Sequence, residues 1–543
     1  MRAIVLLCAA IVCIGLLGPA RAEFRLTILH INDLHSRIEA INRFDSTCST
    51  EEAVRGECFG GFARIAAKVA ERRAALASEG RHSLILDAGD QFQGSLFYIE
   101  YKGRDSAELM NAIGFDAMAV GNHEFDDGPQ NLASFIEAVE FPVISGNTVV
   151  AAAETVLVGK IEPGVTVERG GEKIAILSVL ATDTDETSSP GPNVSFLDEV
   201  AYLKQAVREV EAAGIDKIVL LSHVGFVRDR EIAAAVDGID VIVGGHSHTL
   251  MSNTVPGVPA YPFLVRNPSG RDVPIVQAYA YSKYLGELDV VFDDDGNVVS
   301  ATGEPHLLDA SVVPDPAMEA RIAELSSPLL EIRNRVVGST TAPLDGARNA
   351  CRFGECIMGN LIADAILDRL SQQGVEIVIT NGGGLRAAID GGEVTMGEVL
   401  TVLPFQNTVA TFRMTGKDIR ASLEHGVSGL EEGAGRFPQV AGLRYVFDAT
   451  AAPGGGRIAT VDVVGADGET IPLDDDRIYT VATNNYLRGG GDGYALFVTN
   501  ALDAYDYGPN LEDVVAEYLG RNSPYAPLID GRVQLLQDIS QRP

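Results

Sequence analysis

Short apolar runs rich in Leu, Ile and Val recur through the first half of the chain, and several end directly at a polar residue. Runs of this length and composition are typical of buried strands. Five of the nine histidines follow such runs, and one further run ends in acidic residues. The strand-end segments are Asp33-Leu34-His35, Asp87-Ala88-Gly89-Asp90, Gly121-Asn122-His123-Glu124, Ser222-His223 and Gly245-His246-Ser247-His248.

These segments are expected to converge. The carboxyl ends of parallel strands meet at one edge of a sheet, where open α/β sheets bind their ligands. The segments offer carboxylate and amide oxygens together with imidazole nitrogens, a donor set that suits one or two divalent cations. The sequence therefore favours a metal-dependent hydrolase.

The rest of the first half alternates strand patterns with helical patterns, as at Phe62–Ala77 and Tyr202–Ala213. This alternation predicts βαβ units and a largely parallel sheet covered by helices, which is the α/β class. Near its end, Leu288–Val299 contains an Asp- and Gly-rich turn between two apolar runs and predicts a hairpin.

The alternation of strand and helix patterns ends at about Pro316. Ala317–Arg335 has helical periodicity and is interpreted as a linker helix, although it also fits the last helix of the first domain. Beyond it, helices are predicted at Asn360–Arg369 and Gly416–Glu424, and a buried strand at Val375–Ile379. The second half is thus mixed α and β.

A chain of 543 residues is too long for one ordinary core. We predict a signal peptide at 1–22, a first domain at 23–312, a linker at 313–336 and a second domain at 337–543. The signal peptide follows from basic Arg2, the apolar stretch Ala3–Leu17 and the small-x-small ending Ala20-Arg21-Ala22. The apolar stretch is shorter than the roughly 20 residues of a spanning helix. We expect a periplasmic or secreted protein without a stable membrane anchor.

The cysteines indicate the redox compartment, and the net charge excludes one class of partner. Cys48 with Cys58 and Cys351 with Cys356 are expected to form local disulfides, as in an oxidising compartment. The rival, a thiolate zinc site, would need all four to converge, and no Cys-x-x-Cys spacing supports it. A formal net charge of −33 without a Lys/Arg cluster argues against a nucleic-acid polymer as partner.

The order of the strand-end signatures, DxH, GD, GNHE, SH and GHSH, resembles the calcineurin-like metallophosphoesterases. Four later segments resemble the C-terminal domain of the 5′-nucleotidases: Cys351–Cys356, Asn381–Arg386, Leu403–Phe405 and Asn485–Gly493. The cysteine-bracketed Arg352 resembles the ecto-5′-nucleotidase and NAD-nucleotidase branch in particular. The resemblance covers nearly all of the chain after the signal peptide. It implies a layered α/β sandwich in the first domain and a mixed α+β substrate-binding domain after the linker helix.

The resemblance also implies two divalent cations, drawn from Zn, Mn, Co and Mg. One would be held by Asp33, His35, Asp90 and His248. The other would be held by Asp90, Asn122, His223 and His246. Two such cations activate a water and neutralise phosphoryl oxygens. His123 would stabilise charge on the transition state or leaving oxygen, and Asp126 would orient that imidazole.

For the substrate, the resemblance implies a clamp on the phosphate and a sandwich around the base. Arg352 and Arg386 would hold the phosphate, and Arg37 would add a third contact. The remaining substrate contacts would come from Asn122, Asn381, Phe405, Tyr486 and Asp492. Asn381 would bond the substrate near the phosphate end, the two aromatic rings would stack on the base, and Asp492 would accept from the ribose hydroxyls.

The leading function is hydrolysis of nucleoside 5′-monophosphates, with cleavage of NAD or UDP-sugar pyrophosphate as a further activity. Alternatives are a thiosulfohydrolase, a 2′,3′-cyclic-nucleotide phosphodiesterase, and a non-catalytic nucleotide-binding or adhesive protein. The last would tolerate loss of ligands, and none is lost. We expect a small nucleotide as partner and a monomer or weak homodimer. On composition, Thr182–Ser189 is a solvated loop, and His82, His306 and His425 are surface residues.

Overall fold

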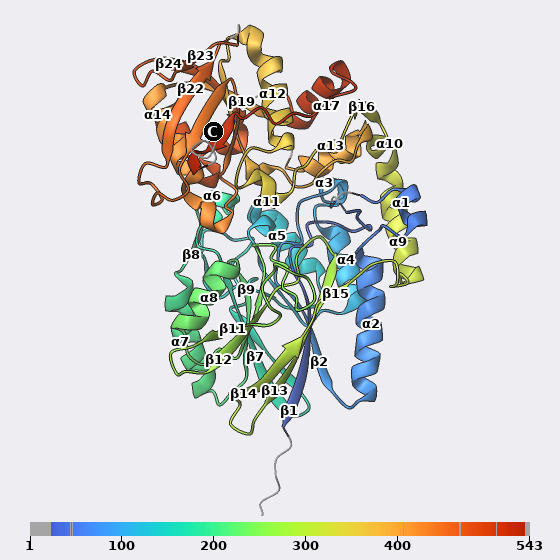
Figure 1. Ribbon diagram of the computed structural model, residues 1–543. Coiled ribbons are helices and arrows are strands. Elements are labelled where there is room, and N and C mark those ends of the chain that lie inside the picture. The colour runs from blue at the N-terminus through green and yellow to red at the C-terminus, as the bar shows by residue number, and fades with distance from the viewer. Residues whose placement is uncertain are drawn as a thin grey trace, which may run out of the picture.

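The computed structural model describes residues 23–43, 45, 47–405, 407–465, 468–506 and 508–537, so the predicted signal peptide lies outside the described residues. Two sheets lie at the centre of the N-terminal half (Figure 1). The first has the order β14 (Val298–Gly303), β13 (Tyr284–Phe292), β1 (Phe24–Ile31), β2 (His82–Asp87), β3 (Ala117–Ala119) and β4 (Val143–Ile144), with β15 (His306–Leu307) beside β13. The second has the order β11 (Phe263–Arg266), β12 (Asp272–Val276), β10 (Val241–Gly244), β9 (Ile218–His223), β7 (Glu172–Leu180) and β6 (Gly164–Arg169).

The two sheets bury their facing sides against each other, because alternate residues of a strand point to opposite faces. In β1, Leu26 and Ile28 enter the core between the sheets, whereas Leu29 and Ile31 enter the core beneath the helices. The outer helices are α2 (Phe62–Ser78), α4 (Arg104–Ile113) and α5 (Gly128–Ala138) on one side, and α7 (Glu199–Ala212) and α8 (Phe226–Ala235) on the other. The predicted layered α/β sandwich is confirmed.

Parallel pairing sets the direction of the strand ends. β1, β2, β3 and β4 run parallel, as do β7, β9, β10 and β12. Their carboxyl ends therefore point the same way, toward the C-terminal half of the chain (Figure 1). The predicted hairpin is also present, with β13 and β14 antiparallel and joined by a turn at Asp293–Asn297.

The C-terminal half contains a mixed five-stranded sheet and a four-stranded sheet. The five-stranded sheet has the order β20 (Pro438–Ala441), β17 (Ile377–Asn381), β24 (Ile478–Asn484), β19 (Val409–Thr415) and β25 (Leu502–Tyr505). The four-stranded sheet has the order β23 (Thr470–Pro472), β22 (Ile458–Val464), β21 (Leu443–Phe447) and β26 (Val533–Leu535). The helices packed with them include α12 (Ile357–Leu370), α13 (Met396–Val402), α14 (Gly416–Gly426) and α17 (Leu511–Arg521).

The predicted linker helix is divided in two. Helix α9 (Pro316–Ser326) packs on α2, and helix α10 (Leu330–Arg333) packs on α13. A short 3-10 turn at Ser327–Leu329 separates them. Pro328 lies in this turn, and its missing N–H cannot continue the α-helical bonding. The break lets α9 pack on the N-terminal half of the protein and α10 on the C-terminal half.

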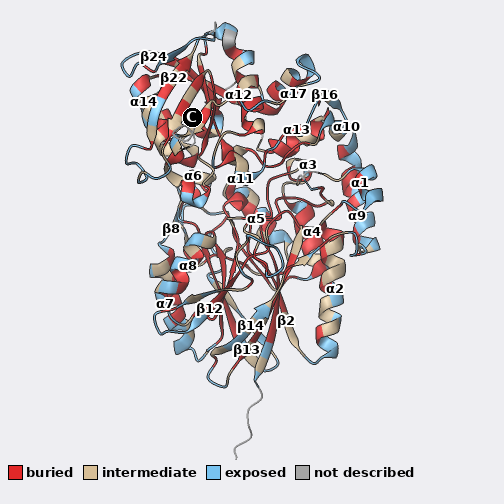
Figure 2. Ribbon diagram, in the orientation of Figure 1, coloured by how far each residue is buried: buried red, intermediate tan, exposed pale blue. Residues whose placement is uncertain are grey.

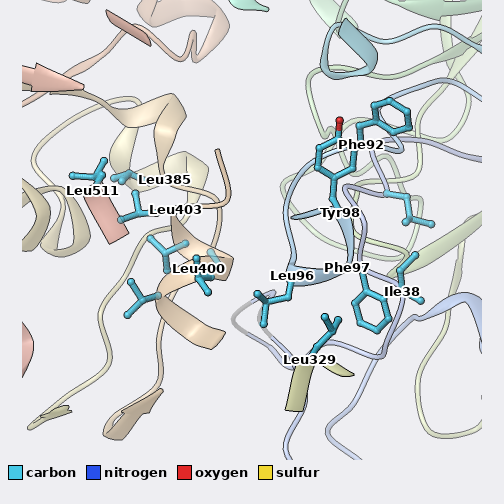
Figure 3. Close-up of a cluster of buried hydrophobic side chains, with 14 of the residues drawn as sticks. Ile38, Phe92, Leu96, Phe97, Tyr98, Leu329, Leu385, Leu400, Leu403 and Leu511 are labelled. Atoms are coloured by element: carbon cyan, nitrogen blue, oxygen red, sulfur yellow. The ribbon is translucent and has the colours of Figure 1, made fainter. Parts of the chain in front are cut away.

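One apolar core continues between the two halves. It includes Phe97 from α3 (Leu96–Tyr101), Leu329 from the linker and Leu400 from α13. Figure 3 shows members of this cluster from both halves, and Figure 2 shows the buried residues following the sheets and this junction. Within the described residues, no helix combines the length and the apolar character needed to cross a bilayer.

A buried ion network joins α2 to the first sheet. Glu287 on β13 accepts hydrogen bonds from Arg72 at 2.7 and 2.8 Å, and His306 Nε2 lies 2.7 Å from the same carboxylate. His306 is thus paired rather than a free surface residue. Burial alone would raise the pKa of Glu287, but His306 and Arg72 outweigh it and lower the pKa to about 2.

We predict that Glu287→Gln lowers the free energy of unfolding by about 2 kcal/mol at pH 7. Because the folded pKa lies below the usual value, this stabilisation is present above about pH 4.5 and is lost as pH falls toward 2. Urea denaturation of both proteins over that range measures it, with exposed Glu168→Gln on β6 as the control. A difference that stayed constant down to pH 3 would contradict the assignment.

Candidate functional site

The strand-end segments of the two sheets converge as the sequence predicts. Three overlapping groups of buried side chains each bring their ligating atoms within 4.8 Å of one another. The groups are Asp33, His35 and His248; His35, Asp90 and His123; and Asp90, His223 and His246. Asn122 lies against the last group, because its Oδ1 is 2.9 Å from His246 Nδ1. Asp90 belongs to two of the groups, which places it between the others.

Backbone carbonyls fix which ring nitrogens face the cluster. Phe92 O lies 3.1 Å from His35 Nδ1, and Ala88 O lies 2.6 Å from His223 Nδ1. A carbonyl oxygen has no proton to give, so each Nδ1 donates and each Nε2 carries a lone pair. His35 Nε2 then faces His248 Nε2 at 3.0 Å, and His223 Nε2 faces Asp90 Oδ2 at 3.1 Å. A proton or a cation between the two atoms of each pair relieves the repulsion between facing lone pairs.

The electrostatics of the cluster also favour a cation. Burial lowers the pKa of His246 to about 3, and it lowers the pKa of His35 and His248 well below the usual range. These imidazoles are therefore neutral near pH 7, the form that binds metal. Burial disfavours a charged His223, yet Asp90 and Asp33 raise its pKa to about 10. The residues present fit divalent cations, since buried carboxylates here require positive charge nearby.

The backbone around the cluster is in an uncommon conformation. Asp33, His35, Asp90, His246 and His248 all have φ between 50° and 70°. Non-glycine residues rarely adopt this region, and each such residue costs of the order of 1 kcal/mol. Hydrogen bonds from the loop after β1 to the loop after β2 hold it there: Asp33 N to Gly89 O at 2.9 Å and His35 N to Asp90 O at 3.0 Å.

Two glycines make this close approach possible. A side chain on Gly89 would lie 2.7 Å from Gly121 N and 2.9 Å from His223 Nδ1. A side chain on Gly121 would lie 2.3 Å from Asp90 Oδ1. Only glycine lets the loops after β2 and β3 pass so close to the ligating groups.

Glu124, the last residue of the GNHE segment, is a supporting residue that sequence reasoning left without a role. Its carboxylate is completely buried and accepts four backbone N–H groups, those of Asp90, Gln91, Phe92 and Gly121, at 2.7–3.2 Å. These bonds fix the loop that carries Asp90. Its position directly after a buried strand could have predicted this role, because a buried acid needs hydrogen-bond partners.

His123 stands beside the cluster with its own acidic partner. Its Nδ1 lies 2.6 Å from Asp126 Oδ2, so Nε2 faces away from Asp126. Burial opposes a charged ring, but Asp126 and Asp90 together raise the pKa of His123 above its usual value. These two carboxylates favour the protonated form of the His123 ring, the form that can donate to an anion.

A cavity of about 830 Å³ opens over the cluster and extends to the C-terminal half. Among the residues that line it, the following were predicted from the sequence: Asp90, Asn122, His123, Asp126, His246, His248, Arg352, Asn381, Arg386, Phe405, Tyr486 and Asp492. Asp33, His35 and His223 lie deeper, beneath this lining. Residues more than 300 positions apart in the sequence therefore share one cavity.

The cavity is cationic on the side of the C-terminal half. Arg348, Arg352 and Arg386 all line it. Burial lowers the pKa of Arg348 to about 10 and that of Arg352 well below its usual range, and the neighbouring guanidinium groups lower both further. Crowded, partly desolvated cations favour an anionic ligand between them. Arg348 was missed in the sequence, although its spacing of four from Arg352 puts both on one helical face.

Two predicted contacts have different surroundings from those expected. Arg37 lies behind Arg386 rather than in the cavity lining: its Nη2 donates to Arg386 O at 3.3 Å, and its guanidinium stacks over Tyr281. Asn381 donates to Asp492 Oδ2 at 2.6 Å, which places it beside the residue expected at the ribose rather than at the phosphate end.

The two aromatic residues flank different parts of the lining. Phe405 stacks near the His123 ring at 5.6 Å, with the Arg386 guanidinium 5.6 Å from its centre. Tyr486 O–H donates to Asp492 Oδ1 at 3.2 Å, and His425 Nε2 lies 2.8 Å from Asp492 O. The expectation that His425 is a surface residue is wrong, because it supports the loop that carries Asp492.

Both predicted disulfides are present, Cys48–Cys58 and Cys351–Cys356. The second closes the loop that carries Arg352. Gln439 on β20 is fully buried; it donates to Cys351 O and Gly354 O and accepts from Cys356 N. It thereby fixes both ends of the arginine loop, a role that no local sequence signal reveals.

The Thr182–Ser189 segment is not the solvated loop that its composition predicts. It forms the short helix α6 (Thr184–Thr187), lines the cavity and contacts the Gly491–Gly493 turn of the C-terminal half. Thr184 is fully buried. Polar composition misleads here because the segment covers a polar cavity rather than open solvent.

Comparisons with known proteins agree with this geometry. Residues 26–250 match the calcineurin-like phosphoesterase family, and residues 336–499 match the C-terminal domain of 5′-nucleotidase. A snake venom 5′-nucleotidase from Gloydius brevicauda is 36% identical over 552 residues, covering 98% of this chain and 92% of the relative. Among solved structures, a 5′-nucleotidase precursor from Thermus thermophilus is 37% identical with a TM-score of 0.89, covering 96% of this chain and all of that one. The NAD nucleotidase of Haemophilus influenzae is 30% identical with a TM-score of 0.57, covering 95% and 99%.

Proposed function

The chain belongs to the 5′-nucleotidase family of metallophosphoesterases, and we propose that it releases phosphate from nucleoside 5′-monophosphates such as AMP with the help of two divalent cations. One observation carries this proposal. A single cavity joins a buried carboxylate–imidazole cluster to three arginines and two aromatic residues. A phosphate monoester with an attached base is the ligand that needs the metal-binding cluster, the arginines and the aromatic rings together.

We assign the first cation to Asp33, His35, Asp90 and His248, and the second to Asp90, Asn122, His223 and His246. The convergence of these side chains and the orientation of their lone pairs support the assignment. When bound, such cations acidify a water and neutralise phosphoryl oxygens. Their identity among Zn, Mn, Co and Mg is left to the loading experiment below.

The remaining steps belong to side chains of this protein. Arg348, Arg352 and Arg386 hold the phosphate as planar, charged donors. His123, kept protonated by Asp126, donates toward the oxygen on which charge develops. These interactions strengthen as negative charge develops on the leaving oxygen and is spread over the phosphoryl oxygens, which lowers the barrier.

The nucleoside is assigned to Phe405, Tyr486, Asn381 and Asp492. Their common position in the cavity supports this, because a base needs a π-face and a ribose needs an acceptor. The same features favour a nucleotide over a protein-bound sulfonate, which has no base to stack. NAD or a UDP-sugar is the second candidate, supported by the similarity to an NAD nucleotidase.

We place the cations in residues 23–312 and nucleoside recognition in residues 337–543, with 313–336 as the linker. We also propose export to the periplasm or medium, supported by the two disulfides and by the similarity to a venom enzyme.

The direct test is phosphate release from AMP by the purified protein after loading with Mn²⁺, Zn²⁺, Co²⁺ or Mg²⁺, with and without a chelator. Elemental analysis should find about two ions per chain, and chelation should abolish turnover. Asp90→Ala should lose more metal than His248→Ala, because Asp90 serves both sites. A metal-free protein that still released phosphate would overturn the proposal.

His123→Ala should retain both ions and lower kcat for AMP roughly 100- to 1,000-fold, because it removes a donor to the developing charge rather than a ligand. Metal content and kcat measured on the same sample separate the two roles. His82→Ala, far from the cavity lining, is the control. Near-normal turnover of the His123 variant would show that this residue is structural.

Tyr486→Ala should raise KM for AMP about 5- to 100-fold while leaving hydrolysis of a simple aryl phosphate within about twofold, since stacking is worth ~1–3 kcal/mol. Comparing kcat/KM for the two substrates measures the effect. Equal losses on both substrates would mean that Tyr486 supports the fold rather than the base.

A further inference from the structure

The α6 segment touches both halves of the cavity. It follows β7, whose last residue, Leu180, lies beside His223 of β9 in the sheet. Its helix contacts the Gly491–Gly493 turn, which contains Asp492. Figure 1 shows α6 lying against the C-terminal half. It is therefore the part of the N-terminal half that contacts the loop assigned to the nucleoside.

One side chain of this segment reaches the acid behind His123. Ser188 O–H donates to Asp126 Oδ1 at 2.6 Å, while His123 Nδ1 donates to Asp126 Oδ2 at 2.6 Å. Both oxygens of one carboxylate are thus engaged by different elements. The Asp126 side chain is only 12% exposed, so water competes weakly for these oxygens.

A carboxylate held at one oxygen can still turn about its Cβ–Cγ bond, whereas one held at both oxygens has a fixed plane. The plane of the Asp126 carboxylate sets the direction in which His123 Nδ1 donates, and hence where His123 Nε2 points. Partners of this kind orient the rings that perform chemistry.

We propose that Ser188 is a positioning residue for the hydrolytic reaction: it fixes the Asp126 carboxylate, and through it the His123 ring, from a segment that rests on the nucleoside loop. The proposal rests on the function proposed above. Because α6 contacts the Gly491–Gly493 turn, the seating of the C-terminal half helps to set the position of Ser188. The contact between α6 and the C-terminal half and the orientation of the His123 ring then depend on each other through Ser188.

The test uses the metal-loaded full chain with AMP. Ser188→Ala should lower kcat roughly 5- to 20-fold, with KM for AMP changed less than about twofold, because a hydrogen bond to a charged group is lost without loss of a substrate contact. Ser188→Thr keeps the hydroxyl and should restore kcat to within about threefold. Ser195→Ala, at an exposed position of β8 (Val194–Phe196) outside the cavity lining, is the matched control and should keep the kcat of the original protein.

A double-mutant cycle with Asp126→Ala separates positioning from a general structural effect. Without the carboxylate, Ser188→Ala should change kcat by less than about 1.5-fold. An equal loss in both backgrounds, or an unchanged kcat in Ser188→Ala alone, overturns the proposal. Failure of the unmodified protein to hydrolyse AMP would instead overturn the proposed function.

A second readout does not depend on turnover. In protein labelled at histidine with ¹⁵N, the His123 Nδ1–H resonance reports its short hydrogen bond to Asp126. Ser188→Ala should shift this resonance and speed its exchange with water, whereas Ser195→Ala should not. An identical resonance in both variants overturns the positioning role whatever the substrate proves to be.

Discussion

The structure depends on the burial of two carboxylates, Asp33 and Asp90, among histidine side chains. Asp33 is fully buried and Asp90 nearly so, and burying an unpaired charge is among the largest costs a fold can carry. The surroundings are built to meet that cost with positive charge from a bound cation. Carbonyl oxygens turn the histidine lone pairs inward, and the loops that hold them accept left-handed backbone conformations. Glu124 then fixes the Asp90 loop through four backbone bonds.

Local positive charge in the cavity explains how an acidic protein can bind an anion. A net charge of −33 repels a nucleotide at long range, yet screening limits that repulsion to about 10 Å in ordinary salt. Acidic side chains also line the cavity, but Arg348, Arg352 and Arg386 lie close enough together to lower the pKa of Arg348 and Arg352, so positive charge is concentrated on that side. Arg386 lies 2.9 Å from His35 Nε2, so the arginine group and the cluster meet at one point.

Much of this site could be predicted because its residues follow strands that the apolar runs mark clearly. Asp33, Asp90 and His223 come together in overlapping clusters, as their positions at strand ends predict. The α/β class follows from the alternation of strands and helices, whereas the layered sandwich follows from the resemblance to a known family. The resemblance to a known family supplied the cavity residues of the second half. Supporting residues could not be found in this way. Gln439 and Ser188 act through contacts across 83–88 and 62 positions, and nothing in their neighbours marks them. The break of the linker helix was visible in Pro328 but was not used.

The continuous apolar core bears on how the two halves move. Phe97, Leu329 and Leu400 belong to one cluster across the junction, which constrains rotation of the two halves about the linker. The linker also carries polar ties to the N-terminal half, from Tyr101 to Leu325 O and from Arg333 to Glu39. Full separation would expose this apolar surface at roughly 25 cal/mol per Å². A rotation that keeps the junction packed and moves the distant Asp492 loop costs far less. Such a rotation would produce its largest displacement next to α6, because α6 lies at the end of the cavity away from the linker.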